Sequence, residues 1–130
     1  MKIIKNSCYG GYSLSEKAIM RYAELKGIKL YSNKFNNSHT DYYLVPKEEF
    51  DKVYTKCKNK KNYKEANNLY FDYHNIERTD PILIKVIEEL GDEANEPCAD
   101  LEIVVIPDNI DYEIEDYDGI ETIHETHRTW

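Results

Sequence analysis

The chain has 130 residues, 41% of them apolar, which is enough for one hydrophobic core and leaves no room for a second domain of ordinary size. No apolar run approaches the roughly 20 residues needed to cross a bilayer, and charges interrupt the first five residues too early for a signal peptide. With a net charge of −8, the composition excludes a membrane-spanning protein and predicts a cytoplasmic one without a membrane partner.

The N-terminal part of the chain predicts a strand, a glycine-containing turn and a helix. β-branched residues favour a strand over residues 1–6, and residues 8–12 are typical of a tight loop. Ser13 and Glu16 have the spacing of a capping box, in which each side chain bonds the backbone N–H of the other residue. A helix is therefore expected after Ser13, ended by Gly27 in the left-handed conformation.

The middle of the chain is less regular. Residues 28–31 predict a short strand, and the Asn-rich residues 32–41 lack periodicity and are expected to form a surface loop. Residues 42–45 predict another strand, and Pro46 opens a helix with two acids in its first turn. The lysines and asparagines of residues 56–62 fit either the end of that helix or a connection.

A third helix and an apolar strand follow. Asp80 can cap the helix, Pro81 suits its first position, and Gly91 ends it after a stripe of apolar residues. Residues 101–106 form the most apolar strand of the chain, which predicts a place in the middle of a sheet.

The C-terminal part has the pattern of a β-hairpin. Apolar and polar residues alternate before Asp118-Gly119, a dipeptide that favours a two-residue turn. Pairing across this turn places Ile114 opposite Ile123 and Tyr117 opposite Ile120. The chain is therefore expected to be a single α+β domain over residues 1–130, with about three helices, a mostly antiparallel sheet and a variable Asn- and Lys-rich segment around residues 32–75.

Charge is distributed unevenly along the chain. Residues 1–64 carry 14 Lys and Arg against 6 Asp and Glu, a net +8, whereas residues 65–130 carry 3 against 19, a net −16. Such asymmetry predicts oppositely charged faces, which can pair between subunits of a homo-oligomer. The cysteines at positions 8, 57 and 98 lack a paired spacing and are expected to be reduced thiols, with Cys8 as the alternative reactive one.

The loop that contains Gly10 and Gly11 is the first candidate binding site. Two glycines allow the backbone to approach a ligand, the start of a helix offers N–H groups to an anion, and Tyr9 and Tyr12 can stack on a base. The alternative is an ordinary strand-to-helix turn with its cap. The spacing matches neither a P-loop nor a dinucleotide-binding motif.

The C-terminal tail is the second candidate. Arg128 can bind a phosphate or carboxylate and Trp130 can stack or fill a subunit interface, although Arg128 can equally pair with a neighbouring acid. His124 and His127 are three residues apart, which in a strand places them on opposite faces and disfavours a metal site. The serines before the first helix lack a nearby histidine or an elbow motif. We therefore expect a protein that is not an enzyme, with no catalytic residues, metal or cofactor.

The negative charge of residues 65–130 affects which macromolecules the protein is expected to bind. A net −16 would repel a phosphate backbone, so we expect no nucleic acid partner, although the lysines of residues 52–64 are a local exception. The acidic face offers an alternative function, in which the protein inhibits a host defence nuclease by binding it directly or by mimicking DNA.

Several short motifs resemble those of a family of small phage and prophage proteins. They lie within residues 1–31 and 76–130: Tyr9-Gly10-Gly11-Tyr12 with Leu14-Ser15, Arg78-Thr79-Asp80-Pro81, Ile106-Pro107-Asp108, Tyr117-Asp118-Gly119 and His127-Arg128-Thr129-Trp130. Within that group the chain resembles the Thoeris anti-defence sponges of the first described type. The resemblance implies a phage protein in an infected bacterium that sequesters a cyclic ADP-ribose signal, or a cyclic oligonucleotide, without cleaving it.

The resemblance also implies which residues bind that signal. Family members are oligomers that hold the ligand where subunits meet, with arginines on the pyrophosphate and aromatic or Asn side chains around the adenine. In this sequence Arg21 and Arg128 are the candidates for the first role. Tyr9, Tyr12 and Asn95 are the candidates for the second role.

Overall fold

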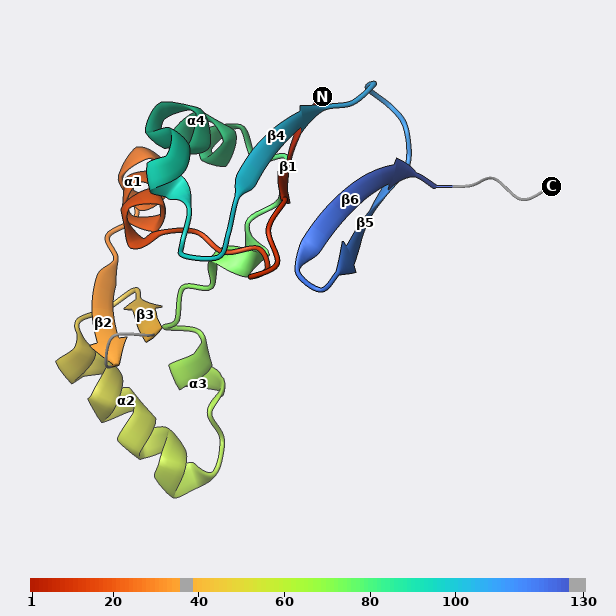
Figure 1. Cartoon of the computed structure of the whole chain (residues 1–130). Coiled ribbons are helices and arrows are strands. Elements are labelled where there is room, and N and C mark those ends of the chain that lie inside the picture. Colours follow the sequence, from red (N-terminus) through yellow and green to blue (C-terminus); the bar gives the residue numbers. More distant parts are fainter. Residues whose placement is uncertain (36–38, 127–130) are drawn as a thin grey trace. The chain divides into compact units, whose positions relative to one another are not determined.

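A computed structural model of the chain describes residues 1–35 and 39–126 (Figure 1). The chain forms two compact units, the first made of residues 1–22 and 76–130 and the second of residues 23–75. Helices and antiparallel strands occur in both, so the α+β class is confirmed. The residue range of the second unit largely overlaps the Asn- and Lys-rich segment around residues 32–75.

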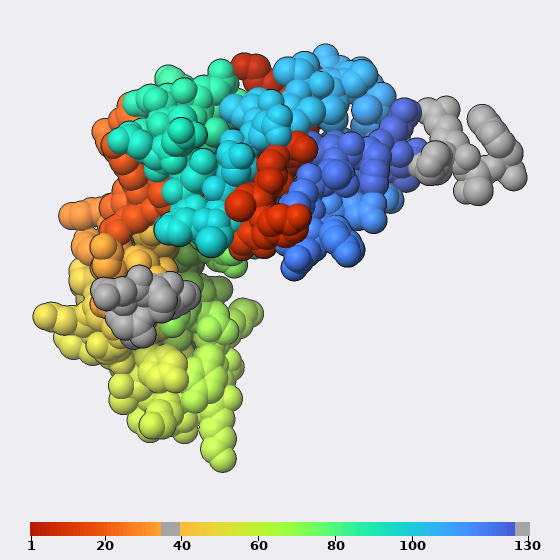
Figure 2. All heavy atoms as spheres, in the orientation of Figure 1, coloured from red at the N-terminus to blue at the C-terminus, as the bar shows by residue number. Residues whose placement is uncertain are grey.

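The first unit combines two strand pairs with two helices. Strand β1 (Lys2–Asn6) pairs antiparallel with β4 (Leu101–Val105), and β5 (Tyr112–Tyr117) pairs with β6 (Ile120–Glu125). In Figures 1 and 2, β1 lies between β4 and the β5–β6 hairpin. Helix α1 (Glu16–Lys26) begins in this unit, and α4 (Pro81–Leu90) runs into the short 3-10 turn η2 (Gly91–Ala94). The buried core includes Ile3, Ile4, Ile19, Leu83 and Val86.

Helix α1 is capped by Ser15, so the capping box predicted at Ser13 is wrong. The Ser15 Oγ accepts a hydrogen bond of 3.1 Å from the Ala18 N–H and donates one of 2.6 Å to the Glu93 carbonyl. The Ser15 N–H also donates to the Ala94 carbonyl at 2.9 Å. Contacts with η2, distant in the sequence, thus decide which serine starts the helix.

The predicted cap of α4 is confirmed. The Asp80 carboxylate accepts hydrogen bonds from the N–H groups of Ile82 and Leu83 at 2.8 and 3.2 Å, and Pro81 occupies the first helical position. The second carboxylate oxygen accepts a 2.9 Å bond from the Tyr22 hydroxyl of α1. Burial, together with this bond to Asp80, raises the pKa of Tyr22 to about 12, so the hydroxyl remains a donor.

The predicted hairpin is confirmed in its register. Ile114 lies opposite Ile123 and Tyr117 opposite Ile120. Asp118 and Gly119 have φ values of 53° and 90°, as a two-residue turn with two left-handed positions requires.

The position predicted for the apolar strand is wrong. Strand β4 belongs to a two-stranded sheet with β1 and does not lie in the middle of a larger one. Its most exposed apolar side chain, Val105, is 73% accessible. Hydrophobic composition predicts how much of a strand is buried on average, but it does not identify the neighbour that buries it.

The second unit contains a hairpin and the helix α2. Strands β2 (Tyr31–Phe35) and β3 (His39–Tyr43) pair antiparallel, so residues 32–35 and 39–41 do not form the surface loop predicted from their composition. Helix α2 (Lys47–Lys60) follows Pro46 as predicted and continues through the lysine-rich segment. The short helices α3 (Lys64–Asn67) and η1 (Tyr73–Asn75) complete the unit.

The core of the second unit is small and aromatic. Tyr43, Phe50, Cys57 and Ala66 are buried together. Backbone bonds of 2.8 Å from Leu44 to Leu69 and from Phe71 to Tyr42 join the chain after α3 to the end of β3. No helix in the described part of the chain is both long and apolar enough to span a membrane.

Candidate functional site

The glycines of the candidate loop are packed against the protein's own backbone. The Gly10 N–H donates a 2.8 Å hydrogen bond to the Cys98 carbonyl, and a Cβ added at Gly10 would lie 2.1 Å from that oxygen. A Cβ added at Gly119 would lie 2.2 Å from the Tyr9 carbonyl oxygen and 2.6 Å from the Gly11 nitrogen. These glycines therefore permit close contact between the loop, the hairpin turn and the Cys98 segment.

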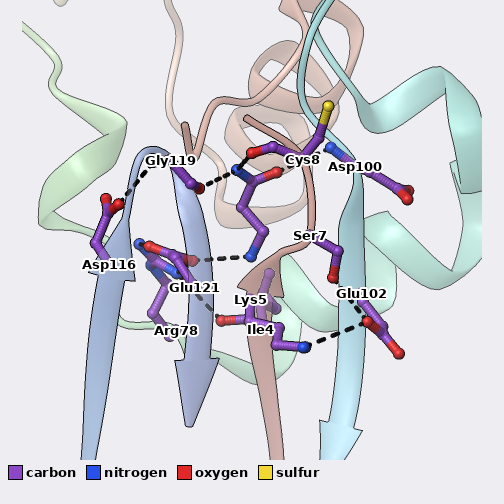
Figure 3. Close-up of polar contacts among 11 residues, drawn as sticks. Ile4, Lys5, Ser7, Cys8, Arg78, Asp100, Glu102, Asp116, Gly119 and Glu121 are labelled. Carbon is purple, nitrogen blue, oxygen red and sulfur yellow. Dashed lines mark hydrogen bonds and ion pairs between the residues drawn. The ribbon is translucent and has the colours of Figure 1, made fainter. Parts of the chain in front are cut away.

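Asn6 connects these segments at the end of β1. Its amide Nδ2 donates to the carbonyls of Cys8 and Gly119 at 2.7 and 2.6 Å, and its Oδ1 accepts from the Asp100 N–H at 2.9 Å. Its backbone N–H donates to Glu121 Oε1 at 2.8 Å. This side chain therefore joins the turn after β5 to the start of β4, and its partners Cys8, Asp100 and Gly119 are labelled in Figure 3. Since these polar groups of Asn6 bond within the protein, they hold the fold together.

The second element of this network is a buried ion pair. Arg78 donates to both carboxylate oxygens of Glu121, at 2.7 and 2.8 Å, and the Glu121 side chain is only 5% exposed (Figure 3). Arg78 also donates to the Ile4 carbonyl at 3.2 Å, and its guanidinium carbon lies 3.4 Å from the centroid of the Tyr12 ring. This bidentate, stacked geometry is one that Lys cannot reproduce.

The Arg78–Glu121 pair closes the outer edge of β1. The Ile4 N–H donates to the Arg78 carbonyl at 3.0 Å, while the Ile4 carbonyl and the Asn6 N–H bond to the two side chains. A strand edge normally needs a neighbouring strand to satisfy these groups. Here one arginine and one glutamate, 43 residues apart, take that role.

The environment of Glu121 sets its ionisation. Burial alone would raise the pKa of its carboxyl group. Hydrogen bonds from Arg78 and the Asn6 amide, together with the charges of Arg78 and Lys5, outweigh burial and lower that pKa below the ordinary value of 4.5. The carboxylate is therefore ionised at neutral pH, and it is not suited to act as a proton donor there.

This shift predicts a change of stability in acid. A group with a lowered folded-state pKa stabilises the fold above its unfolded-state value, and that contribution is lost as the pH falls through the folded-state value. We expect the Glu121→Gln variant to be less stable than the wild type at pH 7. The difference should shrink as the pH falls below about 4.5 and through the lower pKa of the folded-state Glu121 carboxyl group. Urea midpoints of both proteins between pH 7 and 3 measure it, and a pH-independent difference would contradict this role.

The candidate ligand residues of the first unit do not form one site, because most of them have separate contacts within the protein. Arg21 forms an ion pair with Glu89, at 3.4 Å, and the Tyr12 ring supports the Arg78 guanidinium. The Asn95 Oδ1 accepts a 2.9 Å bond from the Leu101 N–H, so this side chain caps β4. Tyr9 is 69% exposed. The other candidate arginine, Arg128, lies outside the described residues.

Other chemical candidates are also engaged locally. His124 lies 2.9 Å from Glu115 on the hairpin, and its predicted companion His127 lies outside the described residues. Within residues 1–35 and 39–126 no group of three His, Cys, Asp or Glu side chains is placed to hold a metal. The three cysteines are free thiols, and Cys57 is buried. The hairpin exposes Glu113, Glu115 and Asp116, so the acidic-inhibitor hypothesis stays a prediction.

A different surface was missed by sequence reasoning. Two exposed tyrosines of the second unit, Tyr54 and Tyr70, pack against the buried Phe50 ring, and a third, Tyr63, packs against Tyr54. The centroid distances are 6.0 Å from Phe50 to Tyr54, 4.9 Å from Phe50 to Tyr70, and 5.5 Å from Tyr54 to Tyr63. Their positions in the sequence show no common period, so only folding brings these rings together.

Lysines border these tyrosines. Lys47 Nζ lies 5.2 Å from the centroid of the Phe50 ring and also forms an ion pair with Asp51. Lys58 follows Tyr54 by four residues, on the same face of α2. We call the surface made by Tyr54, Tyr63, Tyr70, Lys47 and Lys58 the tyrosine–lysine face. The yellow and green atoms of α2 and the following segment lie on the visible surface in Figure 2.

The local charge of this region is strongly positive. Residues 52–64 contain six lysines and no acid, and residues 23–75 carry ten lysines against seven acids, a net +3. The remaining residues, which belong to the first unit, carry a net −11. The charge asymmetry of the sequence thus follows the division into units.

Comparison with protein-family models, curated proteins and solved structures found no match.

Proposed function

We propose that the protein is a non-catalytic binding protein that sequesters a nucleotide-type anion, such as a cyclic ADP-ribose isomer or a cyclic oligonucleotide, on the tyrosine–lysine face. The observation that carries this proposal is the juxtaposition of exposed tyrosine rings with lysines, next to a stretch of residues 52–64 that has six lysines and no acid. Aromatic rings stack on nucleobases of any sequence, and lysine ammonium groups attract phosphates. The resemblance to a sponge family implies the same class of ligand, but its motifs lie in residues 1–31 and 76–130 and do not include this face.

The geometry favours this face over the glycine loop. Protein backbone fills the space beside Gly10 and Gly119. Asn6 bonds within the protein, and Arg21 is paired with Glu89. A ligand at the loop would have to displace these contacts. On the tyrosine–lysine face, by contrast, Tyr54 is 45% exposed, Tyr63 39% and Tyr70 40%, so a base can stack without breaking a hydrogen bond that positions the fold.

The proposal predicts an effect of Tyr54→Ala on ligand binding. Loss of one stacking ring should cost about 1–3 kcal/mol of binding free energy, roughly a 5- to 150-fold weaker complex. Calorimetry with cyclic ADP-ribose isomers, cyclic di- and trinucleotides and a short single-stranded oligonucleotide distinguishes a small signal from a nucleic acid strand. Ligand recovered from the heated complex should be chemically intact.

Two lysine variants provide the matched control. Lys58→Ala should weaken binding and reduce its salt dependence, because Lys58 shares the face of Tyr54. Lys52→Ala removes the same charge from a position two residues before Tyr54, which does not face it, and should leave binding nearly unchanged. Binding that survives Tyr54→Ala but is lost in Arg21→Ala would return the site to the first unit. No binding of any of these ligands would reject the proposal.

A further inference from the structure

Strand β4 has an outer edge whose backbone groups point away from β1. Met1 and Ile106 exchange hydrogen bonds of 2.8 and 2.9 Å, and the Ser7 N–H donates to the Asp100 carbonyl at 2.8 Å. Because bonded and non-bonded pairs alternate along an antiparallel ladder, Glu102 and Val104 direct their N–H and C=O groups to β1. Leu101, Ile103 and Val105 direct theirs outward.

The fold satisfies the corresponding edge of β1 but not that of β4. On β1, the Arg78–Glu121 pair and the Arg78 backbone bond the outward groups of Ile4 and Asn6. On β4, the Leu101 N–H is bonded to Asn95 Oδ1. Among the described residues, the outward N–H and C=O groups of Ile103 and Val105 have no partner.

Apart from Glu102, the side chains of β4 lack the features that protect an edge strand. Natural edges carry lysines, prolines or bulges that prevent pairing with another chain. Here residues 103–106 are Ile-Val-Val-Ile, and Val105 is 73% exposed. Leu101, Ile103 and Val105 lie on one face of the strand, since side chains alternate between the two faces. This composition is unusual for a strand with an uncovered edge.

We propose that the outer edge of β4 pairs with β4 of a second copy of this chain, in antiparallel register about a two-fold axis at Val104. In this register Ile103 lies opposite Val105 of the second copy, and the two residues exchange hydrogen bonds through their outward N–H and C=O groups. Leu101 lies opposite Pro107, which has no N–H to donate. The result is a four-stranded sheet, β1–β4–β4–β1, across the dimer.

The sequence of β4 is self-complementary in this register. Leu101, Ile103 and Val105 of both copies form one continuous apolar row on the same face of the sheet. Glu102 lies opposite Ile106 of the second copy, so the two glutamates do not face one another. The Leu101 N–H keeps its bond to Asn95, because only Ile103 and Val105 exchange backbone hydrogen bonds in this register. An isologous interface of this kind closes after two subunits and does not extend into a fibre.

The oligomeric state of two Val105 variants tests this proposal. The monomer has a mass of 15.4 kDa, and the wild type should sediment as a dimer of twice that mass. Val105→Lys places a desolvated charge in the apolar row and should raise the dimer dissociation constant at least about 10-fold. Val105→Thr retains a β-branched side chain of similar size and should remain dimeric. Sedimentation velocity over a range of concentrations provides the measurement.

Folding is checked in the same samples, and each outcome has a clear meaning. Because Val105 is exposed in the monomer, both variants should keep the wild-type circular dichroism spectrum and urea midpoint at concentrations where all are monomeric. A wild type that is monomeric up to about 100 µM, well above the dissociation constants of specific complexes, would overturn the proposal even if the edge captured an extended peptide. A Val105→Lys dimer as stable as the wild type would overturn it too.

Discussion

Replacing Arg78 with Met is expected to destabilise the protein by about 3–5 kcal/mol, because the buried Glu121 carboxylate would lose its charge partner. Both oxygens of that carboxylate accept bonds from Arg78, and its side chain is 5% exposed. The loss is a large fraction of the roughly 5–15 kcal/mol that stabilises an ordinary domain. Urea unfolding at pH 7, followed by circular dichroism, measures the change.

An exposed ion pair of the same unit is the control. Lys17 lies 2.8 Å from Glu93, and the two side chains are 60% and 64% exposed. Lys17→Met should therefore change stability by less than about 1 kcal/mol. If Arg78→Met cost no more than Lys17→Met, the buried pair would not hold the hairpin to β1.

The double variant Arg78→Met, Glu121→Leu distinguishes two contributions of the pair. Removing both charges should recover part of the loss, since no buried charge remains unpaired. Recovery should be incomplete by about 1–3 kcal/mol, because the Asn6 N–H and the Ile4 carbonyl lose their bonds to Glu121 and Arg78. The incomplete recovery would show that the pair also replaces a neighbouring strand.

Local sequence patterns predicted the strands and helices whose turn or capping residues lie close to them in the sequence. The hairpin follows from period-two alternation around Asp118-Gly119, and its register is the observed one. Helix α4 follows from Asp80 and Pro81 at its start and Gly91 at its end. In each of these elements, the residues that form the structure lie within a few positions of the residues that signal it.

Long-range contacts decided the features that the sequence did not reveal. Two serines compete to cap α1, and the backbone of Ala94 selects Ser15. Glu121 lies among many acids in the sequence, and only its position beside Arg78 distinguishes it. Likewise the β2–β3 hairpin forms in a segment with little apolar alternation, so β-propensity alone could not predict it.

The candidate binding residues illustrate the same limit. Tyr-Gly-Gly-Tyr before a helix is a pattern shared by anion sites and by tight structural turns. The contacts of Gly10 with Cys98, and of Gly119 with Tyr9, belong to the second kind. The tyrosine–lysine face has no short motif, because its rings come from α2, from the segment before α3 and from the segment after it.

Replacing Gly119 with Ala is expected to cost about 2–5 kcal/mol of stability, from left-handed strain of about 1–2 kcal/mol and overpacking of about 1–3 kcal/mol. Gly119 has a φ of 90°, and its added Cβ would lie 2.2 Å from the Tyr9 carbonyl oxygen. That oxygen belongs to backbone, which cannot move aside as a flexible side chain would. Urea unfolding again measures the loss.

Gly11 is the matched control, because its φ of 85° is similar and nothing lies within 4 Å of its added Cβ. Gly11→Ala should therefore show only the conformational strain. The difference between the two variants measures how tightly the glycine loop packs on the hairpin turn. Equal losses would mean that the loop yields easily, and a loop that yields could also admit a ligand. A clearly larger loss for Gly119→Ala would show that protein backbone fills the space a phosphate would need, which favours the tyrosine–lysine face as the binding site.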